Sequence, residues 1–207
     1  MDQVFTAQQV TDHVYWVGAV DWSIRDFHGY STSRGTSYNA FLILGDEPIL
    51  VDTVKAPFRD EMFQRIASVI EPSSIRHVIS NHSEMDHSGC LPDVIERIRP
   101  RTVFASAKGA EALARHFGLS GVQAVADGQA MTLGGAELRF YETRMLHWPD
   151  SMFTYYAADR VLFSSDAFGM HLAGTQRFTD EMPWDVVEQE CAKYYANILL
   201  PFSKLVL

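Results

Sequence analysis

The sequence predicts an α+β fold in which two β-sheets pack face to face between outer helices, a four-layer αββα sandwich. The order of its elements is the first observation: strands, helix, strand, helix, strand, helix, strands and a final helix. Composition is the second. Hydrophobic residues make up 47% of 207 residues, enough for a substantial core. No apolar run approaches the ~20 residues that a membrane span needs.

The first part of the chain alternates short apolar strands with amphipathic helices. Gly45-Asp46-Glu47 reads as a turn between two strands. Phe58, Met62 and Ile66 fall at helical spacing and predict a helix there. In chain order, we expect strands at 14–17, 38–44 and 48–52, a helix at 57–70, a strand at 76–80, a helix at 90–98, a strand at 102–105 and a helix at 109–117.

The second part is rich in strands over 122–163 and ends in a helical pattern. Gly134-Gly135 predicts a tight hairpin, because two adjacent residues there can adopt positive φ. A strand over 160–165 ends at Asp166, and residues 184–207 form a helix that Pro201 kinks or breaks. Earlier in the chain, the polar and aromatic stretch 21–36 is expected to be a long functional or mobile loop.

The charge of the chain narrows its partners. The net charge is −9 and no stripe of Lys or Arg stands out, which argues against nucleic acid or an anionic membrane as the main partner. The N-terminus has no basic region followed by an apolar one, so no signal peptide is predicted. We expect a cytoplasmic protein in which Cys90 and Cys191 are reduced thiols.

One polar stretch interrupts this apolar pattern with metal-ligating side chains. His82, Glu84, Asp86 and His87 lie between a predicted strand and a predicted helix. In an extended segment, alternate residues point the same way, so the first three can converge, and His87 joins them as the helix begins. Four such groups beside a buried strand repel and desolvate one another without a cation, so a metal site is predicted.

Two further residues are candidates to complete the site. His147 lies in a loop after a predicted strand, and Asp166 directly follows another. Taken alone, a loop His is more often a surface residue and an Asp after a strand is more often a turn or cap. Both gain weight because a metal centre collects its ligands from several strand ends.

These residues carry a family resemblance. The pattern His82-x-Glu84-x-Asp86-His87, with His147 and Asp166 downstream, resembles the metallo-β-lactamase superfamily, whose common motif has His in place of Glu84. The carboxylate there, the upstream run Tyr-Asn-Ala-Phe-Leu-Ile and the Ser-Gly pair after the motif resemble the flavodiiron proteins, also called A-type flavoproteins. The resemblance covers essentially the whole chain and implies a metallo-β-lactamase-like fold.

The resemblance also implies a ligand set and a chemistry. Zinc has no redox chemistry and favours imidazole, whereas a carboxylate gives a harder, more anionic site that suits iron. The implied assignment is His82, Glu84 and His147 to one iron, Asp86 and His87 to the other, and Asp166 as the bridge. His28, Tyr30 and Tyr195 resemble residues near the family's substrate pocket, where a side chain can donate a proton or a hydrogen bond. Each of these three is otherwise an ordinary packing residue, and Asp52 either orients a ligand His or ends a strand.

Two features of the family are missing from this sequence. Its second iron has a further His that falls beyond Leu207, and its FMN-binding flavodoxin-like domain also follows that point. We therefore expect 1–207 to be a di-iron domain, incomplete at its C-terminus, with no FMN site of its own. The apolar run over 202–207 agrees with a fragment of a longer protein. Partial metal occupancy is expected, weakest around Asp86 and His87.

The function implied is that of a reductase. The two irons would reduce O2 to water, or NO to N2O, with electrons relayed through FMN from a rubredoxin-like or flavin reductase donor. A head-to-tail homodimer is implied by resemblance. Two alternatives stay open: a di-iron domain that senses or binds O2 without turnover, and a zinc-dependent hydrolase of the metallo-β-lactamase superfamily, against which Glu84 argues.

Overall fold

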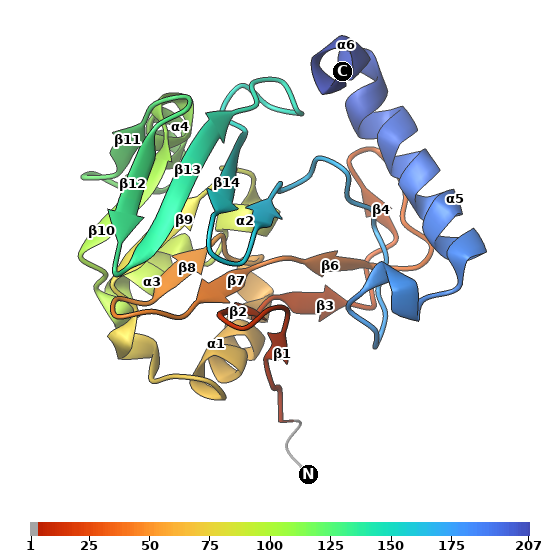
Figure 1. Cartoon of the computed structure of the whole chain (residues 1–207). Coiled ribbons are helices and arrows are strands. Elements are labelled where there is room, and N and C mark those ends of the chain that lie inside the picture. Colours follow the sequence, from red (N-terminus) through yellow and green to blue (C-terminus); the bar gives the residue numbers. More distant parts are fainter. Residues whose placement is uncertain (1–3) are drawn as a thin grey trace.

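Two β-sheets lie face to face in the computed structural model, which describes residues 4–207 (Figure 1). In the larger sheet, the first four strands in spatial order pair antiparallel, and the fourth to the seventh run parallel. The seven-stranded sheet has the order β1 (Gln8–Gln9), β2 (Val14–Trp16), β7 (Phe41–Ile43), β8 (Ile49–Val51), β9 (His77–Ser80), β10 (Thr102–Ser106), β11 (Gln123–Val125). The antiparallel four-stranded sheet has the order β12 (Ala130–Leu133), β13 (Ala136–Glu142), β14 (Met152–Tyr156), β15 (Val161–Phe163).

Apolar side chains from both sheets form the core between them. Ile49, Ile79 and Phe104 of the larger sheet pack in one cluster with Leu138 and Phe140 of the smaller one. Residues of β13 alternate between buried and exposed, which is the period-2 pattern of a sheet with one covered face.

The tight hairpin predicted at Gly134-Gly135 is confirmed. The two glycines join β12 to β13 and have φ angles of 52° and 85°, which most side chains resist. A Cβ on Gly134 would also lie 2.5 Å from the backbone nitrogen of Glu47, so the turn packs directly on the other sheet.

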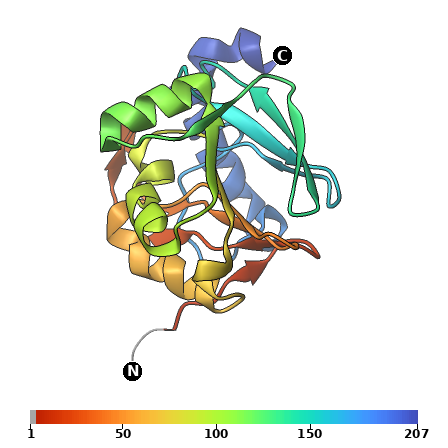
Figure 2. The same cartoon turned by 90° about the vertical axis from the view of Figure 1, so that its left-hand side faces the viewer.

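Three helices cover the other face of the seven-stranded sheet (Figure 2). They are α1 (Arg59–Ala67), α3 (Leu91–Ile98) and α4 (Ala107–Phe117). Met62, Leu91 and Leu113, one from each helix, are completely buried in a cluster with Leu50 and Val78 of the sheet. The predicted helices are therefore confirmed at these positions, and their apolar stripes explain the helical layer.

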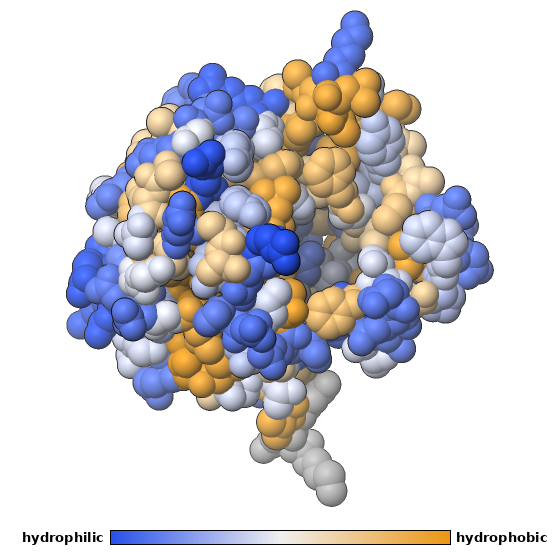
Figure 3. Space-filling model, viewed as in Figure 1, coloured by the Kyte–Doolittle hydropathy of each residue, from blue (hydrophilic) through white to orange (hydrophobic). Residues whose placement is uncertain are grey.

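The C-terminal segment lies beside the sandwich instead of across it (Figure 1). α5 (Trp184–Tyr194) continues through η4 (Tyr195–Leu199), a π-helical turn, η5 (Leu200–Phe202) and α6 (Ser203–Val206), so winding continues past Pro201. Exposed leucines, including Leu200 and Leu205, gather at this end (Figure 3). On the outer face of the smaller sheet, Tyr141 of β13 is exposed.

Among the described residues, no helix is long and apolar enough to cross a membrane.

The stretch predicted as a long loop is more ordered than expected. β4 (Asp26–Phe27) and β5 (Tyr30–Ser31) form a two-residue hairpin, and β3 (Ala19–Asp21) pairs with β6 (Thr36–Tyr38). The turn residues His28 and Gly29 have φ angles of 53° and 80°, the geometry of a type I′ turn. The prediction missed these strands because they are too short to show a hydrophobic period.

The packing between the sheets can be tested with two leucines. Leu138 is completely buried between the sheets, whereas Leu162 on β15 is 46% exposed. We expect Leu138→Ala to lower the free energy of unfolding by about 2–5 kcal/mol, because it leaves a cavity. Leu162→Ala should change it by less than about 1 kcal/mol. Chemical denaturation measures both, and equal losses would contradict the two-sheet core.

Candidate metal centre

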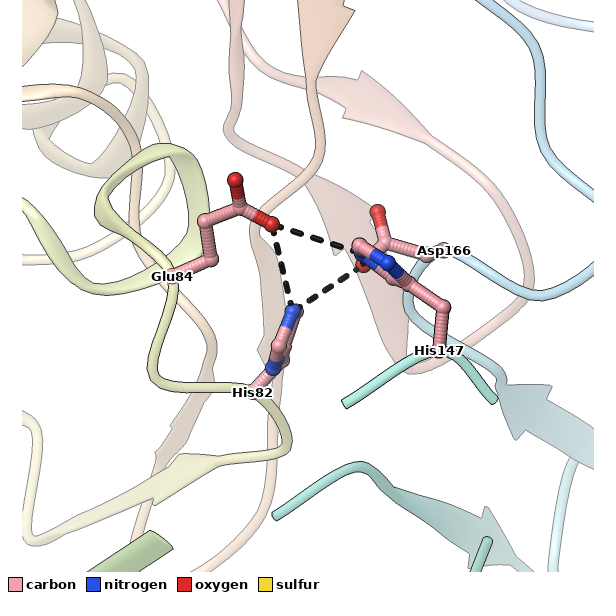
Figure 4. Close-up of side chains that lie close together, drawn as sticks. All are labelled: His82, Glu84, His147 and Asp166. Atoms are coloured by element: carbon pink, nitrogen blue, oxygen red, sulfur yellow. Dashed lines mark ion pairs between the residues drawn. The ribbon is translucent and has the colours of Figure 1, made fainter. Parts of the chain in front are cut away.

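All six predicted ligand residues meet at one edge of the two-sheet sandwich. His82 and Glu84 follow β9 of the larger sheet, His147 lies in the loop between β13 and β14, and Asp166 follows β15 (Figure 4). The remaining two, Asp86 and His87, lie on α2 (Met85–Ser88). Residues far apart in sequence thus come together because the strands of both sheets end at the same place.

Four side chains form the first cluster, with their donor atoms at even spacing. His82 Nε2 lies 3.4 Å from Glu84 Oε2 and 3.3 Å from Asp166 Oδ2. His147 Nε2 lies 3.4 Å and 3.2 Å from the same two oxygens. Donors at the corners of a tetrahedron with bonds of about 2.0–2.1 Å lie about 3.3 Å apart, so this spacing fits a bound metal ion.

The same atoms have no other partner. His82 Nε2, Glu84 Oε2, His147 Nε2 and Asp166 Oδ2 are all buried and none makes a hydrogen bond within the described protein. A buried polar atom without a partner is costly unless a cation or another group binds it. The donor set therefore fits a metal ion on this observation as well as by distance.

A second cluster shares Asp166 with the first. His87 Nε2 lies 3.0 Å from Asp166 Oδ1 and 3.4 Å from Asp86 Oδ2. The two oxygens of Asp166 thus face different clusters, which is the geometry of a bridging carboxylate. The second cluster has three donor residues where the first has four.

The local fold of the motif separates the two clusters. The sequence predicted an extended segment in which Asp86 points with His82 and Glu84, but Asp86 lies in the single turn of α2. The hydroxyl of Ser88 stabilises this turn, because it donates hydrogen bonds to the carbonyl oxygens of Ser83 and Glu84. As a result, Asp86 and His87 form the second cluster together, as the ligand assignment requires.

Burial and charge set the protonation of the centre. Burial alone would lower the pKa of His82 and of His147, but the neighbouring carboxylates outweigh it and raise both pKa values to about 9. Burial alone would raise the pKa of Glu84, but His147 and His82 lower it to about 2. Before a metal binds, the first cluster is therefore a set of imidazolium–carboxylate pairs.

Asp150 orients the first histidine, a role that the sequence did not reveal. Its Oδ2 lies 3.0 Å from His82 Nδ1 and accepts a hydrogen bond of 2.7 Å from the backbone N–H of Ser83. This contact directs Nε2 of His82 to the metal position, as a carboxylate behind a ligand histidine commonly does. The only available signal was the position of Asp150 three residues after His147.

Asp52 acts on the strand that carries the motif. Its carboxylate accepts hydrogen bonds from the backbone N–H and the side-chain amide of Asn81, at 2.7 Å and 3.1 Å. It has a φ of 57°, a left-handed value that Asp adopts more often than most residues, and it is buried. Of the two roles left open for Asp52, the contacts support the strand-end role, since its hydrogen bonds go to Asn81.

Aromatic and imidazole side chains from the hairpin and from α5 line the centre. His28 Nδ1 lies 3.7 Å from Glu84 Oε1, so this predicted residue is near the site. Tyr194, which the sequence did not single out, donates a hydrogen bond of 3.0 Å to Asp166 Oδ1. The predicted Tyr195 lies one residue further on and packs in an apolar cluster with Leu146 and Ile198.

Comparison with known proteins agrees with this geometry. The family profile described as ODP family beta lactamase matches residues 36–198. The chain belongs to this family. Its sequence is 44% identical to rubredoxin-oxygen oxidoreductase of Megalodesulfovibrio gigas and 43% identical to nitric oxide reductase of Moorella thermoacetica. Each alignment covers 95% of this chain and 50% of the relative, so the chain spans about half the length of these curated relatives.

Solved structures of relatives share the fold of this ODP-family domain. The rubredoxin oxygen:oxidoreductase structure from Desulfovibrio gigas matches with a TM-score of 0.94 at 42% identity, over 97% of this chain and 51% of the other. The flavodiiron protein of Giardia intestinalis matches with a TM-score of 0.93 at 38% identity, over 99% of this chain and 51% of the other. The predicted metallo-β-lactamase-like α+β fold and the flavodiiron resemblance are both confirmed.

Metal affinity is expected to rise with pH. A metal ion must displace the protons that His82 and His147 hold below their pKa of about 9. Apparent affinity should therefore increase from about pH 6 to about pH 9 and then level off. Competition with a chelator across this range measures the effect. An affinity that does not change with pH would contradict the imidazolium–carboxylate pairing.

The two clusters should differ in how tightly they hold metal. We expect tight binding in the four-residue cluster and weaker, partial occupancy around Asp86 and His87, because that cluster has fewer donors. His147→Ala should weaken the tighter site at least about tenfold, while Asp86→Asn should weaken only the other. Titration followed by metal analysis measures both. Two fully occupied sites in this chain would contradict the expectation.

Proposed function

We propose that this domain is the di-iron part of a reductase that acts on O2 or NO. Three imidazoles and three carboxylates face the two metal positions, and Glu84 supplies the carboxylate that makes the first cluster anionic. That donor set is harder than the imidazole-rich sites of zinc hydrolases and suits iron that changes oxidation state. The replacement of His by Glu84 is the observation that carries the proposal.

The names of the relatives support this proposal. Proteins similar to this chain are called rubredoxin-oxygen oxidoreductase, nitric oxide reductase and anaerobic nitric oxide reductase flavorubredoxin. Since the chain spans about half their length, we propose that FMN binds in a further domain and relays electrons from a rubredoxin-like or flavin reductase donor. A cytoplasmic location and a head-to-tail homodimer are part of the same proposal.

The residues of this chain have distinct roles in the proposed reaction. Bound iron would supply the electron transfer to O2 or NO. His82, Glu84 and His147 would hold one ion, Asp86 and His87 the other, and Asp166 would bridge them.

Hydrogen bonds orient two of these ligands. Asp150 contacts His82 and Tyr194 donates to Asp166, so His82 and Asp166 each keep one orientation. Thus the protein orients the ligands while the metals carry the redox chemistry.

Access to the centre comes from the side of the hairpin and α5. A hollow opens between the sandwich and the C-terminal segment (Figure 3). His28 borders the first cluster on this side, and its side chain is 7% exposed. Burial lowers the pKa of His28, so its imidazole is neutral near pH 7 and can donate or accept a hydrogen bond there.

Reconstitution with iron tests the proposal. We expect the full-length protein that contains this domain, loaded with iron and FMN and supplied with a reductant, to consume O2 or NO, and its zinc-loaded form to consume neither. Glu84→His should lose reductase activity at least about a hundredfold while keeping the fold, because it restores an imidazole-rich site. Glu111→His, on the exposed surface of α4, is the matched control.

Two outcomes would contradict the proposal. Hydrolysis of an ester, thioester or lactam by the zinc-loaded protein, with no reaction of the iron-loaded protein, would identify a hydrolase. Reversible O2 binding to the iron-loaded protein without consumption would identify a binding or sensing domain. Circular dichroism of each variant separates loss of activity from loss of fold.

A further inference from the structure

A small polar cavity borders the second cluster of the metal centre. Its volume is about 40 Å³, and its lining includes Asp86, His87 and Asp166 on one side and Thr36, His171 and Tyr194 on another. A buried water molecule needs about 10–15 Å³ of space open to its centre, and several polar partners. The cavity therefore has the size and the polarity to hold one water molecule.

His171 is the polar group in this lining that the metal centre does not explain. It is 5% exposed, and its Nδ1 lies 2.8 Å from the hydroxyl of Thr36, which is itself buried. Its other ring nitrogen, Nε2, is buried and has no partner among the described residues. Because Thr36 holds Nδ1, Nε2 is the ring nitrogen left without a partner, as is Asp86 Oδ1 in the same lining.

The rings around His171 hold it in place on its other sides. Its ring lies 5.1 Å from that of Tyr194, 5.2 Å from that of His28 and 5.0 Å from that of Phe27, between centroids. These contacts explain its burial but satisfy no hydrogen bond of Nε2. In the sequence, His171 lies outside the metal-ligand motif, and nothing there marks it.

The small cavity also adjoins the outside. A larger cavity of about 290 Å³ lies beyond it, lined partly by Trp16 and Arg177. The two cavities share Ser37, Asn39 and Met170 among their lining residues. Asn39 is exposed, so the two cavities adjoin each other close to the protein surface.

We propose that His171, positioned by Thr36, holds a water molecule in the small cavity, and that this water links the metal centre to the outer cavity. The inference rests on the proposed function in one respect: reduction of O2 and reduction of NO both take up protons and release water. A water held here provides a hydrogen-bonded path for protons entering from solvent and a route for product water leaving. His171 is a positioning residue in this scheme.

The charge state of His171 suits this role. Burial lowers its pKa to about 4, so the ring is neutral near pH 7 and carries one N–H and one lone pair. A neutral ring can hydrogen-bond a water in either direction without a charge that competes with the metals. The contact with Thr36 uses Nδ1, so Nε2 is the nitrogen left for water in either tautomer of the ring.

Two substitutions separate the proposed role from simple packing. In His171→Asn the amide takes the place of Nδ1, so the contact with Thr36 remains while the cavity-facing atom is lost. In His171→Gln the longer side chain carries its amide to the place of Nε2. A water-binding role predicts that Gln rescues and Asn does not, whereas a role in holding Thr36 predicts the reverse.

A crystal structure of the zinc-loaded chain tests the site without any need for reductase activity. We expect an ordered water within hydrogen-bond distance of His171 Nε2, retained in His171→Gln and absent from His171→Asn. No ordered water beside Nε2 in the unmodified protein, at a resolution that shows other buried waters, would overturn the proposal. The same water in an unchanged place in His171→Asn would also overturn it.

Kinetics with the iron-loaded protein test the consequence. We expect His171→Asn to lower turnover about tenfold and to enlarge the solvent deuterium isotope effect, with KM for the gas unchanged. His171→Gln should stay within about threefold, and equal losses in both variants at full metal content would overturn the role. If the unmodified protein reduces neither gas, the proposed function fails, while the crystallographic result still decides the water site.

Discussion

The cost of burying charge is the constraint on which the rest of this structure depends. Asp86 and Asp166 are 6% and 7% exposed and lie beside three histidines, largely out of reach of bulk water. Burial alone would lower the pKa of His82, but Asp150, Glu84 and Asp166 raise it to about 9, so without a metal a proton on this imidazole offsets the carboxylate charge. A cation replaces that proton and binds the atoms that lack partners. Metal binding and the stability of this edge of the sandwich are therefore parts of one equilibrium.

The two-sheet core serves this centre by fixing where strands end. β9 belongs to the larger sheet and β15 to the smaller, and packing between the sheets places the loops after them side by side. Hydrogen bonds then refine each position: Asp52 holds the end of β9 through Asn81, and Asp150 directs His82. His82 and Asp166 are held rigidly because each follows a packed strand and has a supporting hydrogen bond.

The hairpin of β4 and β5 and the helix α5 add the chemistry around the ligands. His28 reaches the centre because the type I′ turn places it at the hairpin tip, and Tyr194 reaches Asp166 from α5. Neither element belongs to the sandwich core, yet both border the space in which a small molecule would react. His171 packs against His28 and Tyr194 and also lines the small cavity beside the second cluster.

The sequence by itself determined the strands and helices of the core and the six candidate ligands, because hydrophobic period and clustered donors are local features. It also indicated iron over zinc, because the identity of residue 84 is a matter of chemistry. Only the tertiary structure decided that Asp150 orients His82, that Tyr194 and not Tyr195 contacts Asp166, and that His171 faces a cavity. Those roles depend on helix phase, on a two-residue turn and on contacts between distant segments, which leave no period in the sequence.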